Sequence, residues 1–528
     1  MTADWLVRSY LRHRLPPEIH AAFEPVLLEL SDLASGPLWD AQLADRMREP
    51  VLTQWDPWGN RVDQIELTAV WHQAESLAAR FGLTAIPYER RYEQWSRVCQ
   101  FALVHVFHPV TDLYSCPLAM TDGAARTLLG SGNRRLIERA VPHLTSRDAA
   151  QFWTSGQWMT EATGGSDVGQ SQCTAQQDGT LGWRLHGKKW FTSAATSQIA
   201  LTLARPERNG PGGRGLALFY LETRDATGAM NGIRVERLKD KLGSRKVPTA
   251  ELTLDGCLAQ LVGTTTDGTQ AIEPMLRITR AWNSVCAASF ARFGLGLARD
   301  YATKRQAFRA TLADLPLHRD TLDEIDAESA AAFVLTFYLL ELLGLDETTG
   351  LDTERGHLLR TLTPLVKATT GRQAAWAASE TIEAFGGAGY VEDTGIPMLL
   401  RDSQVLPIWE GTTNVLSLDL LLRADLDAGL DVLTRVALAS CDGAGNSILA
   451  PAASVVRAAL RAANDWHRNT TAMDIRQAGA RRFALTIGRA LALALLIDLA
   501  GGVADAEDRQ TATTIALRFS QRDIDQLR

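Results

Sequence analysis

Glu410 is the residue whose type and neighbours best suit acid–base chemistry in this sequence of 528 residues. Gly411 follows it directly, and glycine permits a tight turn that brings the backbone close to a ligand. Either Thr412 or Thr413 can cap a helix that continues with apolar residues. A carboxylate at the mouth of such a helix, with an apolar wall behind it, can abstract a proton because partial burial makes its charged form less stable. A surface glutamate near a helix N-terminus would have the same neighbours, so this segment alone leaves both interpretations open.

A second segment suited to binding or chemistry is the stretch 157–168, which reads Q-W-M-T-E-A-T-G-G-S-D-V. Its glycines, hydroxyls and amides can approach a flat heterocycle or a pyrophosphate closely. It matches neither the Walker loop nor G-x-G-x-x-G, so nucleotide binding does not follow from its spacing. An ordinary β-turn would have the same composition, and this alternative stays open as well.

The elements that must position these two segments alternate between helical and β-rich patterns. Up to residue 155 the apolar residues recur at three- and four-residue steps, with a loop at 56–60. From Gly156 short β-rich runs alternate with turn residues, which predicts an antiparallel β domain inserted into a mainly α protein. Long helical patterns follow over 270–305, 320–345 and 356–385. We therefore expect four parts: an N-terminal helical domain (1–155), a central β domain (156–266), a helical bundle with the base (267–423) and a C-terminal helical extension (424–528).

Composition excludes several classes of protein. With 46% hydrophobic and 22% charged residues the chain is typical of soluble globular proteins, and its net charge of -7 excludes a surface coated in basic residues. Six cysteines without a C-x-x-C pair or a histidine cluster argue against a metal site and against disulfides, and suit the cytoplasm. We see no signal peptide. Arg489 and Asp498 interrupt the apolar run 483–503, so we expect a buried or amphipathic helix and no membrane contact.

Five motifs in register resemble those of the acyl-CoA dehydrogenase family, over about residues 60–425. One motif alone would be a weak signal, but five in the family's order are a strong one. They are Met159-Thr160-Glu161 with Gly165-Ser166-Asp167, the strand Gly187 to Ser193, the turn Leu238 to Arg245, the segment Glu383 to Tyr390 with Arg401-Asp402, and Ile408 to Asn414.

Within that family the adaptive-response (AidB) branch is the most similar. The segments 59–63, 116–121 and 236–243 resemble that branch, as does the presence of helices after residue 424. The resemblance implies an acyl-CoA dehydrogenase-like fold with a helical domain, a β-barrel, a helical bundle and a C-terminal helical extension. It also implies a homotetramer, with an electron-transfer flavoprotein as a partner that could reoxidise the cofactor.

The same resemblance implies FAD as the cofactor and places its ring between the β domain and the bundle. Arg305 and Phe308 resemble the pair that reaches the pyrophosphate of a neighbouring subunit's FAD. Where the family has glycine this chain has Arg309, which disfavours the family's tight turn and could supply a further phosphate contact. The residues implied around the ring are Met159, Thr160, Ser166, Phe191, Ser193, Trp409, Gly411 and Asn414.

The resemblance also narrows the choice of catalytic base. Some members of the family carry the base on the helix after the β domain, directly before an arginine, but here Thr279 precedes Arg280. A neutral hydroxyl cannot take an α-proton near neutral pH, so Glu410 is the remaining candidate. The implied reaction removes the pro-R α-proton of an acyl-CoA thioester and passes a hydride from the β-carbon to flavin N5. Arg280 is expected to contact the substrate.

An alternative function is that of an AidB-like flavoprotein that binds double-stranded DNA in an alkylation response and has weak dehydrogenase activity. The resemblance implies that such binding would use the C-terminal extension. Four arginines there could form a basic stripe that contacts phosphates: Arg476, Arg481, Arg482 and Arg489. A solvated helix face in an arginine-rich chain would look the same, and both interpretations stay open.

Overall fold

The computed structural model describes residues 4–179, 182–423, 425–443 and 447–527. The chain forms two compact units, each built from segments that are far apart in the sequence. We call them the helical unit (Met1–Trp39, Arg90–Pro109 and Arg280–Arg528) and the sheet unit (Asp40–Glu89 and Val110–Thr279).

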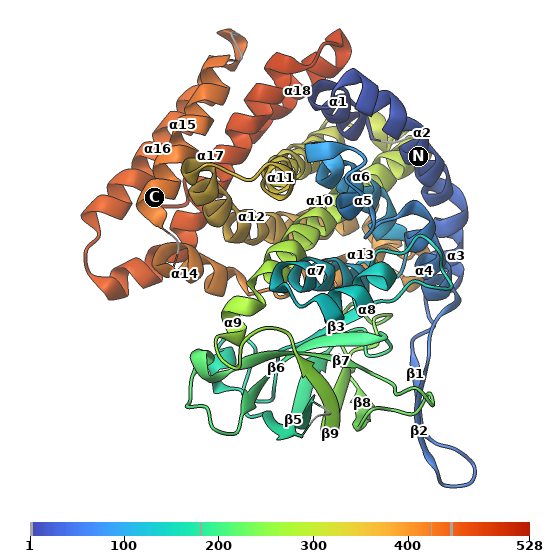
Figure 1. The fold of residues 1–528 in the computed structure, drawn as a ribbon. Helices are drawn as coiled ribbons and strands as arrows, with labels where there is room; N and C mark the ends of the chain where they lie inside the picture. Colours follow the sequence, from blue (N-terminus) through green and yellow to red (C-terminus); the bar gives the residue numbers. More distant parts are fainter. Residues whose placement is uncertain (1–3, 180–181, 424, 444–446, 528) are drawn as a thin grey trace. The chain divides into compact units, whose positions relative to one another are not determined.

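In the helical unit, three long helices carry many of the buried apolar residues (Figure 1). The predicted helices at 270–305, 320–345 and 356–385 are confirmed as α10, α11 and α12. Asp352 caps the start of α12 by accepting a hydrogen bond from the backbone of Arg355 at 2.8 Å, and Gly386 ends it with a positive φ. The elements that lie wholly or for the most part in this unit are α1 (Trp5–Arg14), α2 (Pro17–Leu33), α6 (Ser96–Phe107), α10 (Glu273–Lys304), β10 (Gln306–Ala307), β11 (Ala310–Thr311), α11 (Pro316–Thr348), α12 (Thr353–Phe385), α13 (Ile396–Ser403), α14 (Thr413–Arg423), α15 (Leu426–Gly443), α16 (Ala450–Asn469), α17 (Met473–Gly502) and α18 (Ala506–Ser520).

The C-terminal helices pack directly onto this bundle. Helix α17 contacts α11, α12, α14 and α15, and the prediction that 483–503 is a buried helix is confirmed. Both α11 and α17 are long and apolar enough to cross a membrane by length and composition, but most of each apolar window is buried within the protein. Packing against other helices therefore accounts for their apolar character.

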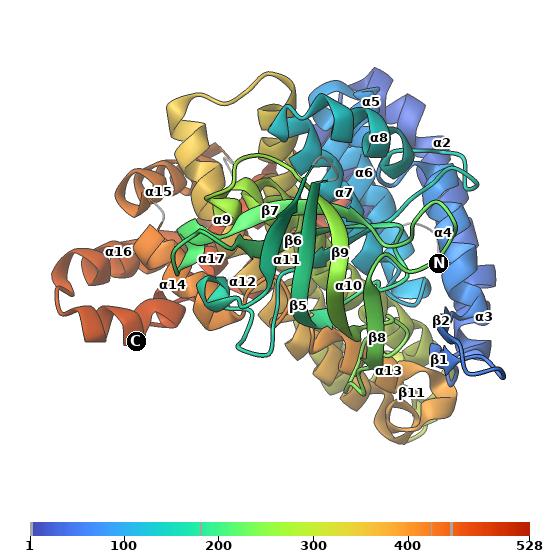
Figure 2. The same ribbon diagram turned by 60° about the horizontal axis from the view of Figure 1, so that its bottom comes forward.

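In the sheet unit, five strands form a closed ring in the order β6-β4-β5-β9-β7, because β7 pairs again with β6 (Figure 2). This ring is the β-barrel that the family resemblance implied. Most pairings are antiparallel, as predicted, but β6 pairs in parallel with β3 and β4, and the alternation of residues had given no sign of this. The bounds are α3 (Trp39–Ala44), β1 (Val51–Trp55), β2 (Arg61–Glu66), α4 (Ala69–Phe81), α5 (Ile86–Glu89), α7 (Ser115–Ser131), α8 (Arg134–Leu144), β3 (Ser155–Trp158), β4 (Thr174–Asp178), β5 (Gly182–Thr192), β6 (Ile199–Pro206), β7 (Ala217–Glu222), β8 (Ile233–Leu238), β9 (Ala250–Leu261) and α9 (Gly268–Ala271).

Successive residues of β6 and β7 enter two different apolar cores because side chains alternate across a strand. Leu201 and Leu218 pack with residues of α7 and α8, whereas Ala200 and Phe219 face the inside of the barrel. Both faces of these strands are buried, which explains why they read as nearly continuous apolar runs.

The hairpin β1–β2 is an element that the sequence did not predict. The loop at 56–60 was predicted and is confirmed as the turn of this hairpin, where Asp56 accepts backbone hydrogen bonds from Trp58 and Asn60 at 2.9 and 2.8 Å. The sequence predicts a helical domain over 1–155, and the strands β1 and β2 within it are a correction to that prediction. Their register is irregular and only one of their residues, Asp63, is fully buried, so they lack the apolar alternation that identifies a strand.

Candidate active site

Glu410 lies in a tight turn between α13 and α14 in the helical unit. Its φ is 58° and that of Gly411 is 104°, so two successive residues have left-handed backbone. For a residue with a Cβ this conformation costs roughly 1–2 kcal/mol. Thr412, one of the two predicted caps, accepts a hydrogen bond from the Val415 amide at 3.3 Å and so begins α14. The surrounding contacts must therefore hold Glu410 in a conformation that it would not adopt alone.

Two cationic side chains hold the carbonyl groups of this turn. Arg280 Nε donates to the Glu410 carbonyl at 3.2 Å, and Lys367 Nζ donates to the Gly411 carbonyl at 2.6 Å. The Arg280 guanidinium also lies 3.4 Å from the Asp419 carboxylate of α14. These contacts give Arg280 a role in fixing the turn, and its expected contact with substrate stays a prediction.

Lys367 was missed by the sequence reasoning. It belongs to α12, is 0% exposed, and its ammonium faces the charged groups of Glu410 and Arg280. Burial lowers the pKa of Lys367 to about 7, with Arg280 adding to the effect and Glu410 opposing it. The available signal was a single lysine within the apolar stretch Leu365 to Ala368, where a charged residue is unusual.

Three other residues of this turn were expected around the flavin. Trp409 is partly buried, while Asn414, on the first turn of α14, is exposed and lies 3.5 Å from an Arg481 nitrogen. Trp409, Gly411 and Asn414 thus lie next to Glu410 because all four belong to the segment 409–414.

The sheet unit carries the five residues predicted to bind the flavin from the β domain, near the ends of β3 and β5. The backbone amide of Trp190 donates to the Thr160 carbonyl at 3.0 Å, which joins the loop after β3 to β5. Phe191 is 50% exposed, and the Lys239 ammonium lies 4.6 Å from the centre of its ring. Ser193 lies within 3.3 Å of the Thr249 hydroxyl, and Met159 packs partly buried against the core of α7 and α8.

The residue types in this region fit a flavin. The hydroxyls of Thr160 and Ser166 form no hydrogen bond with any residue that the structure describes, so both are free to bind a ligand. An exposed aromatic ring beside unpaired hydroxyls suits a flat heterocycle that carries carbonyl and nitrogen acceptors. Gly165 has a steric role here, since a Cβ would lie 2.5 Å from the Thr160 hydroxyl.

A buried ion pair supports this loop from within the barrel. Lys189 Nζ lies 2.8 Å from Glu161 Oε1 and also donates to the Leu203 carbonyl at 2.8 Å. Glu161 accepts the backbone amide of Gln172 at 2.6 Å. Desolvation would raise the pKa of Glu161, but the attraction of Lys189 and these hydrogen bonds together lower it. Glu161 directly follows Thr160, so the ion pair fixes the backbone of the proposed flavin loop.

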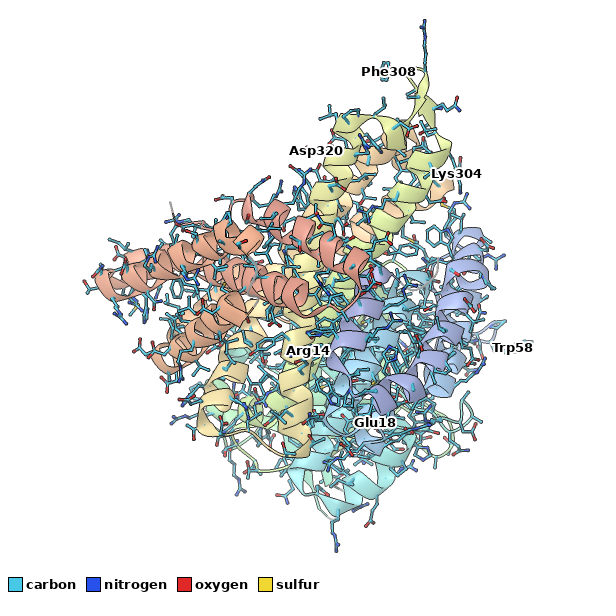
Figure 3. All side chains as sticks on the ribbon, turned by 90° about the horizontal axis from the view of Figure 1, so that it is seen from above. Arg14, Glu18, Trp58, Lys304, Phe308 and Asp320 are labelled. Carbon is cyan, nitrogen blue, oxygen red and sulfur yellow. The ribbon has the colours of Figure 1, made fainter. Side chains whose placement is uncertain are left out.

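The hairpin β10–β11 keeps its tight turn despite Arg309. Phe308 and Arg309 have φ values of 52° and 65° between the paired residues Ala307 and Ala310, so the turn that Arg309 had put in doubt is present. A two-residue hairpin requires left-handed backbone at both positions, and strand pairing offsets the strain at Arg309. Phe308 is 91% exposed at the tip, beyond Lys304 and Asp320 (Figure 3), and Arg305 is exposed at its base.

The four arginines proposed for DNA do not form one exposed stripe, and that prediction is wrong. Arg489 pairs with buried Glu328 at 2.7 Å and lies over the ring of Phe519. Arg476 donates to the carbonyls of His467 and Thr470 at 2.8 and 3.0 Å. Only Arg481 and Arg482 are exposed side by side. The one-letter pattern could not distinguish an arginine that faces α11 from one that faces solvent.

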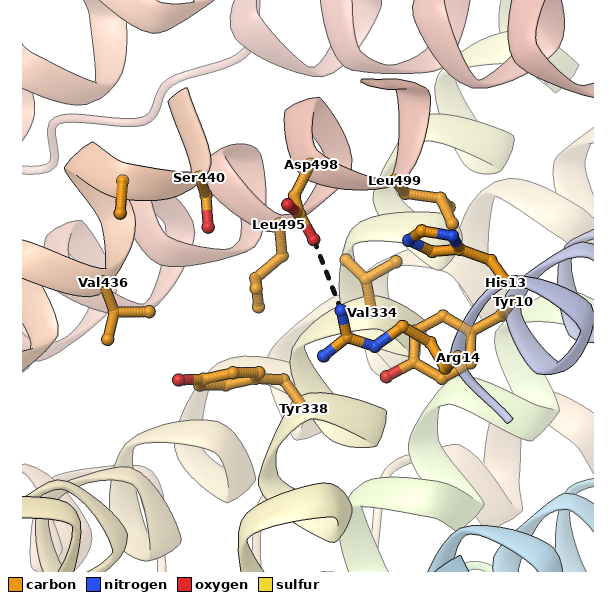
Figure 4. A pocket seen from close by; sticks show the side chains of 11 residues that line it. Tyr10, His13, Arg14, Val334, Tyr338, Val436, Ser440, Leu495, Asp498 and Leu499 are labelled. Carbon is orange, nitrogen blue, oxygen red and sulfur yellow. Dashed lines mark ion pairs between the residues drawn. The ribbon is translucent and has the colours of Figure 1, made fainter. Parts of the chain in front are cut away.

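A cavity of about 310 Å³ lies elsewhere in the helical unit, between α1, α11, α15 and α17 (Figure 4). Arg14 lines this cavity and pairs with Glu341 and, at 3.8 Å, with Asp498. The cavity contains none of the predicted site residues. The residues that line the cavity are Tyr10, His13, Arg14, Val334, Tyr338, Val436, Ala439, Ser440, Leu495, Asp498 and Leu499.

Three family models match most of the chain. Residues 34–149 match the adaptive response protein AidB N-terminal domain, 156–257 the acyl-CoA dehydrogenase middle domain and 266–424 the acyl-CoA dehydrogenase C-terminal domain. The chain is 43% identical over 427 residues to acyl-CoA dehydrogenase family member 11 of Caenorhabditis elegans, covering 79% of this chain and 69% of that protein. It is 28% identical over 395 residues to the putative acyl-CoA dehydrogenase AidB of Escherichia coli, covering 73% and 71%.

Solved structures agree with these relatives. The crystal structure of Caenorhabditis elegans ACDH-11 in complex with C11-CoA has a TM-score of 0.92 at 39% identity and covers 97% of this chain and 90% of that one. The apo-form of Bd2924 has a TM-score of 0.87 at 42% identity, covering 94% and 97%. The similarity thus extends through the C-terminal helices, beyond the residues that the family models match.

Proposed function

Because the chain belongs to the acyl-CoA dehydrogenase family, we propose that it introduces a double bond between the α and β carbons of an acyl-CoA, with Glu410 as the base. It is an oxidoreductase that acts on CH–CH donors, and its cofactor is FAD. In the proposed reaction Glu410 takes the α-proton and the electron pair of that C–H bond forms the double bond. When bound, FAD supplies the acceptor for the hydride that leaves the β-carbon.

The observation that carries this proposal is the turn at Glu410. Arg280 donates a hydrogen bond to the carbonyl of Glu410, and Lys367 donates one to the carbonyl of Gly411. The backbone that carries the Glu410 side chain is therefore held in place in the absence of substrate. A preorganised base loses little free energy to reorganisation during proton transfer. Glu410 is partly buried, which is consistent with a base that must stay reactive while water is excluded.

The relative that holds C11-CoA suggests the first substrate to test. We expect stepwise anaerobic addition of this acyl-CoA to the purified yellow protein to bleach the visible absorbance of oxidised FAD. An acyl-CoA whose α-carbon carries two methyl groups is the matched control, since it has no α-proton to give. Unchanged oxidised flavin with straight-chain acyl-CoAs of every length would overturn the proposed dehydrogenation.

Assembly is the second part of the proposal, and it rests on the hairpin β10–β11. An exposed phenylalanine and an arginine at a protruding hairpin fit a contact with the cofactor of a neighbouring subunit, so we propose a homotetramer. Arg305→Ala is expected to weaken FAD binding by about 10-fold or more, because a charge-assisted hydrogen bond to phosphate is lost. FAD content and light scattering measure this together, with exposed Lys304→Ala as the neighbouring control. A fully flavinylated monomer at micromolar concentration would contradict the assembly.

Binding to double-stranded DNA is not carried into the proposal. Of the four arginines considered, Arg476 and Arg489 are engaged by groups of the helical unit itself. Arg481 and Arg482 alone form a small basic surface in a chain of net charge -7.

A further inference from the structure

Lys367 is a buried amine that is hydrogen-bonded to a backbone carbonyl and not to a carboxylate. Its side chain is 0% exposed, and its one hydrogen bond among the described residues goes to the Gly411 carbonyl at 2.6 Å. Lys367 forms no ion pair with any residue that the structure describes, although desolvating an ammonium group is costly. Methionine would fill the same space without that cost, so the charge needs an explanation beyond packing.

The helix face that carries Lys367 also holds the start of the segment that leads to Glu410. Gly371 lies one helical turn after Lys367 and therefore on the same face of α12. A Cβ at Gly371 would lie 3.1 Å from the Leu406 carbonyl oxygen and 3.2 Å from Pro407 Cα. Helix α12 thus contacts the segment 406–411 at both ends, through close backbone approach at Gly371 and through the ammonium of Lys367.

We propose that Lys367 is a positioning residue for dehydrogenation: it holds the left-handed turn at Glu410 and Gly411 by donating a hydrogen bond to the Gly411 carbonyl, and so keeps the carboxylate of Glu410 in place. The inference rests on the proposed function of Glu410. The charged groups that face Lys367 are Glu410 from the turn and Arg280 from α10, and both lie at this turn. The near-neutral pKa of Lys367 means that its charge, and with it this support, decreases as pH rises above about 7.

The test compares two single variants. Lys367→Met removes both the charge and the hydrogen-bond donor, whereas Lys367→Arg keeps both. We expect Lys367→Met to slow flavin reduction by saturating C11-CoA at least about 10-fold in anaerobic rapid mixing, because the base is misplaced. FAD content, melting temperature and the concentration of acyl-CoA that gives half the maximal rate should stay close to wild type. The loss relative to wild type should shrink as pH rises above about 7, because Lys367 itself then loses its charge in the wild type. Lys367→Arg should recover most of the rate, and the exposed Lys304→Met is the control.

A double variant separates positioning from a general structural role. If Lys367 acts through Glu410, then Glu410→Gln/Lys367→Met should reduce its flavin no more slowly than Glu410→Gln alone. A further loss in the double variant, or a parallel loss of FAD and melting temperature, would overturn the inference. If Lys367→Met does not fold, Lys367→Gln takes its place, because glutamine keeps a donor for the Gly411 carbonyl. The comparison of Glu410→Gln/Lys367→Gln with Glu410→Gln alone then tests the positioning role.

The two proposals fail in different ways. Full activity of Glu410→Gln would remove the proposed base, and the inference about Lys367 with it. A slow Glu410→Gln together with a Lys367→Met as fast as wild type would leave the base in place and reject only the positioning role.

Discussion

Replacing Glu410 by glutamine is expected to slow the reduction of FAD by an acyl-CoA by at least about 100-fold, since positioned acid–base catalysis contributes roughly 10²–10⁴-fold. Glutamine keeps the shape of the side chain and can stand in the same turn, so the contacts of Arg280 and Lys367 with the backbone carbonyls should survive. FAD content and melting temperature should therefore match wild type. Anaerobic rapid mixing measures the reductive step itself, whereas steady-state turnover could be limited by reoxidation or product release.

Glu18→Gln is the matched control, because Glu18 is an exposed glutamate of α2 in the same unit (Figure 3). A complementary variant adds Thr279→Glu to Glu410→Gln, since the resemblance implies that some members of the family carry the base directly before the arginine that corresponds to Arg280. Partial recovery would support the assignment of the base. Wild-type reduction rates in Glu410→Gln would show that Glu410 is an ordinary glutamate near a helix N-terminus.

Replacing Lys189 by methionine is expected to lower the stability of the sheet unit by about 3–5 kcal/mol, because it leaves Glu161 buried without its partner. Lys189 is 0% and Glu161 4% exposed, so water cannot replace the lost ammonium. Removing both charges with Glu161→Gln/Lys189→Met should cost less than Lys189→Met alone. Thermal unfolding and FAD content measure the effect, and Lys188→Met, whose side chain is exposed on the same strand, is the control.

The pH dependence of this ion pair follows from the lowered pKa of Glu161 in the folded protein. Folding lowers the pKa of this carboxylate below its value in the unfolded chain, which is the usual 4.5. The carboxylate therefore stabilises the fold fully at pH values above 4.5, and this stabilisation is lost as pH falls through the folded pKa. The stability gap between wild type and Lys189→Met should therefore narrow as pH falls below about 4.5. A gap that is absent at neutral pH would mean that the pair does not stabilise the unit.

The sequence by itself determined the order of the helical and β-rich parts, because the period of apolar residues differs between a helix and a strand. It placed α10, α11 and α12 where they lie. It did not predict the hairpin β1–β2, whose strands bury too few apolar side chains to show a two-residue period.

Only the folded structure shows which charged residues contact the turn at Glu410. Lys367 and Gly411 are 44 positions apart and Arg280 and Glu410 are 130 apart, and nothing in the local sequence of either segment predicts these contacts. The same holds for Arg489, which a linear reading placed with the exposed arginines and the fold pairs with Glu328 of α11. Apolar periodicity reports only that one face of a helix is buried. The partner of a buried charge depends on how helices that are remote in the sequence pack, and that geometry exists only in the folded chain.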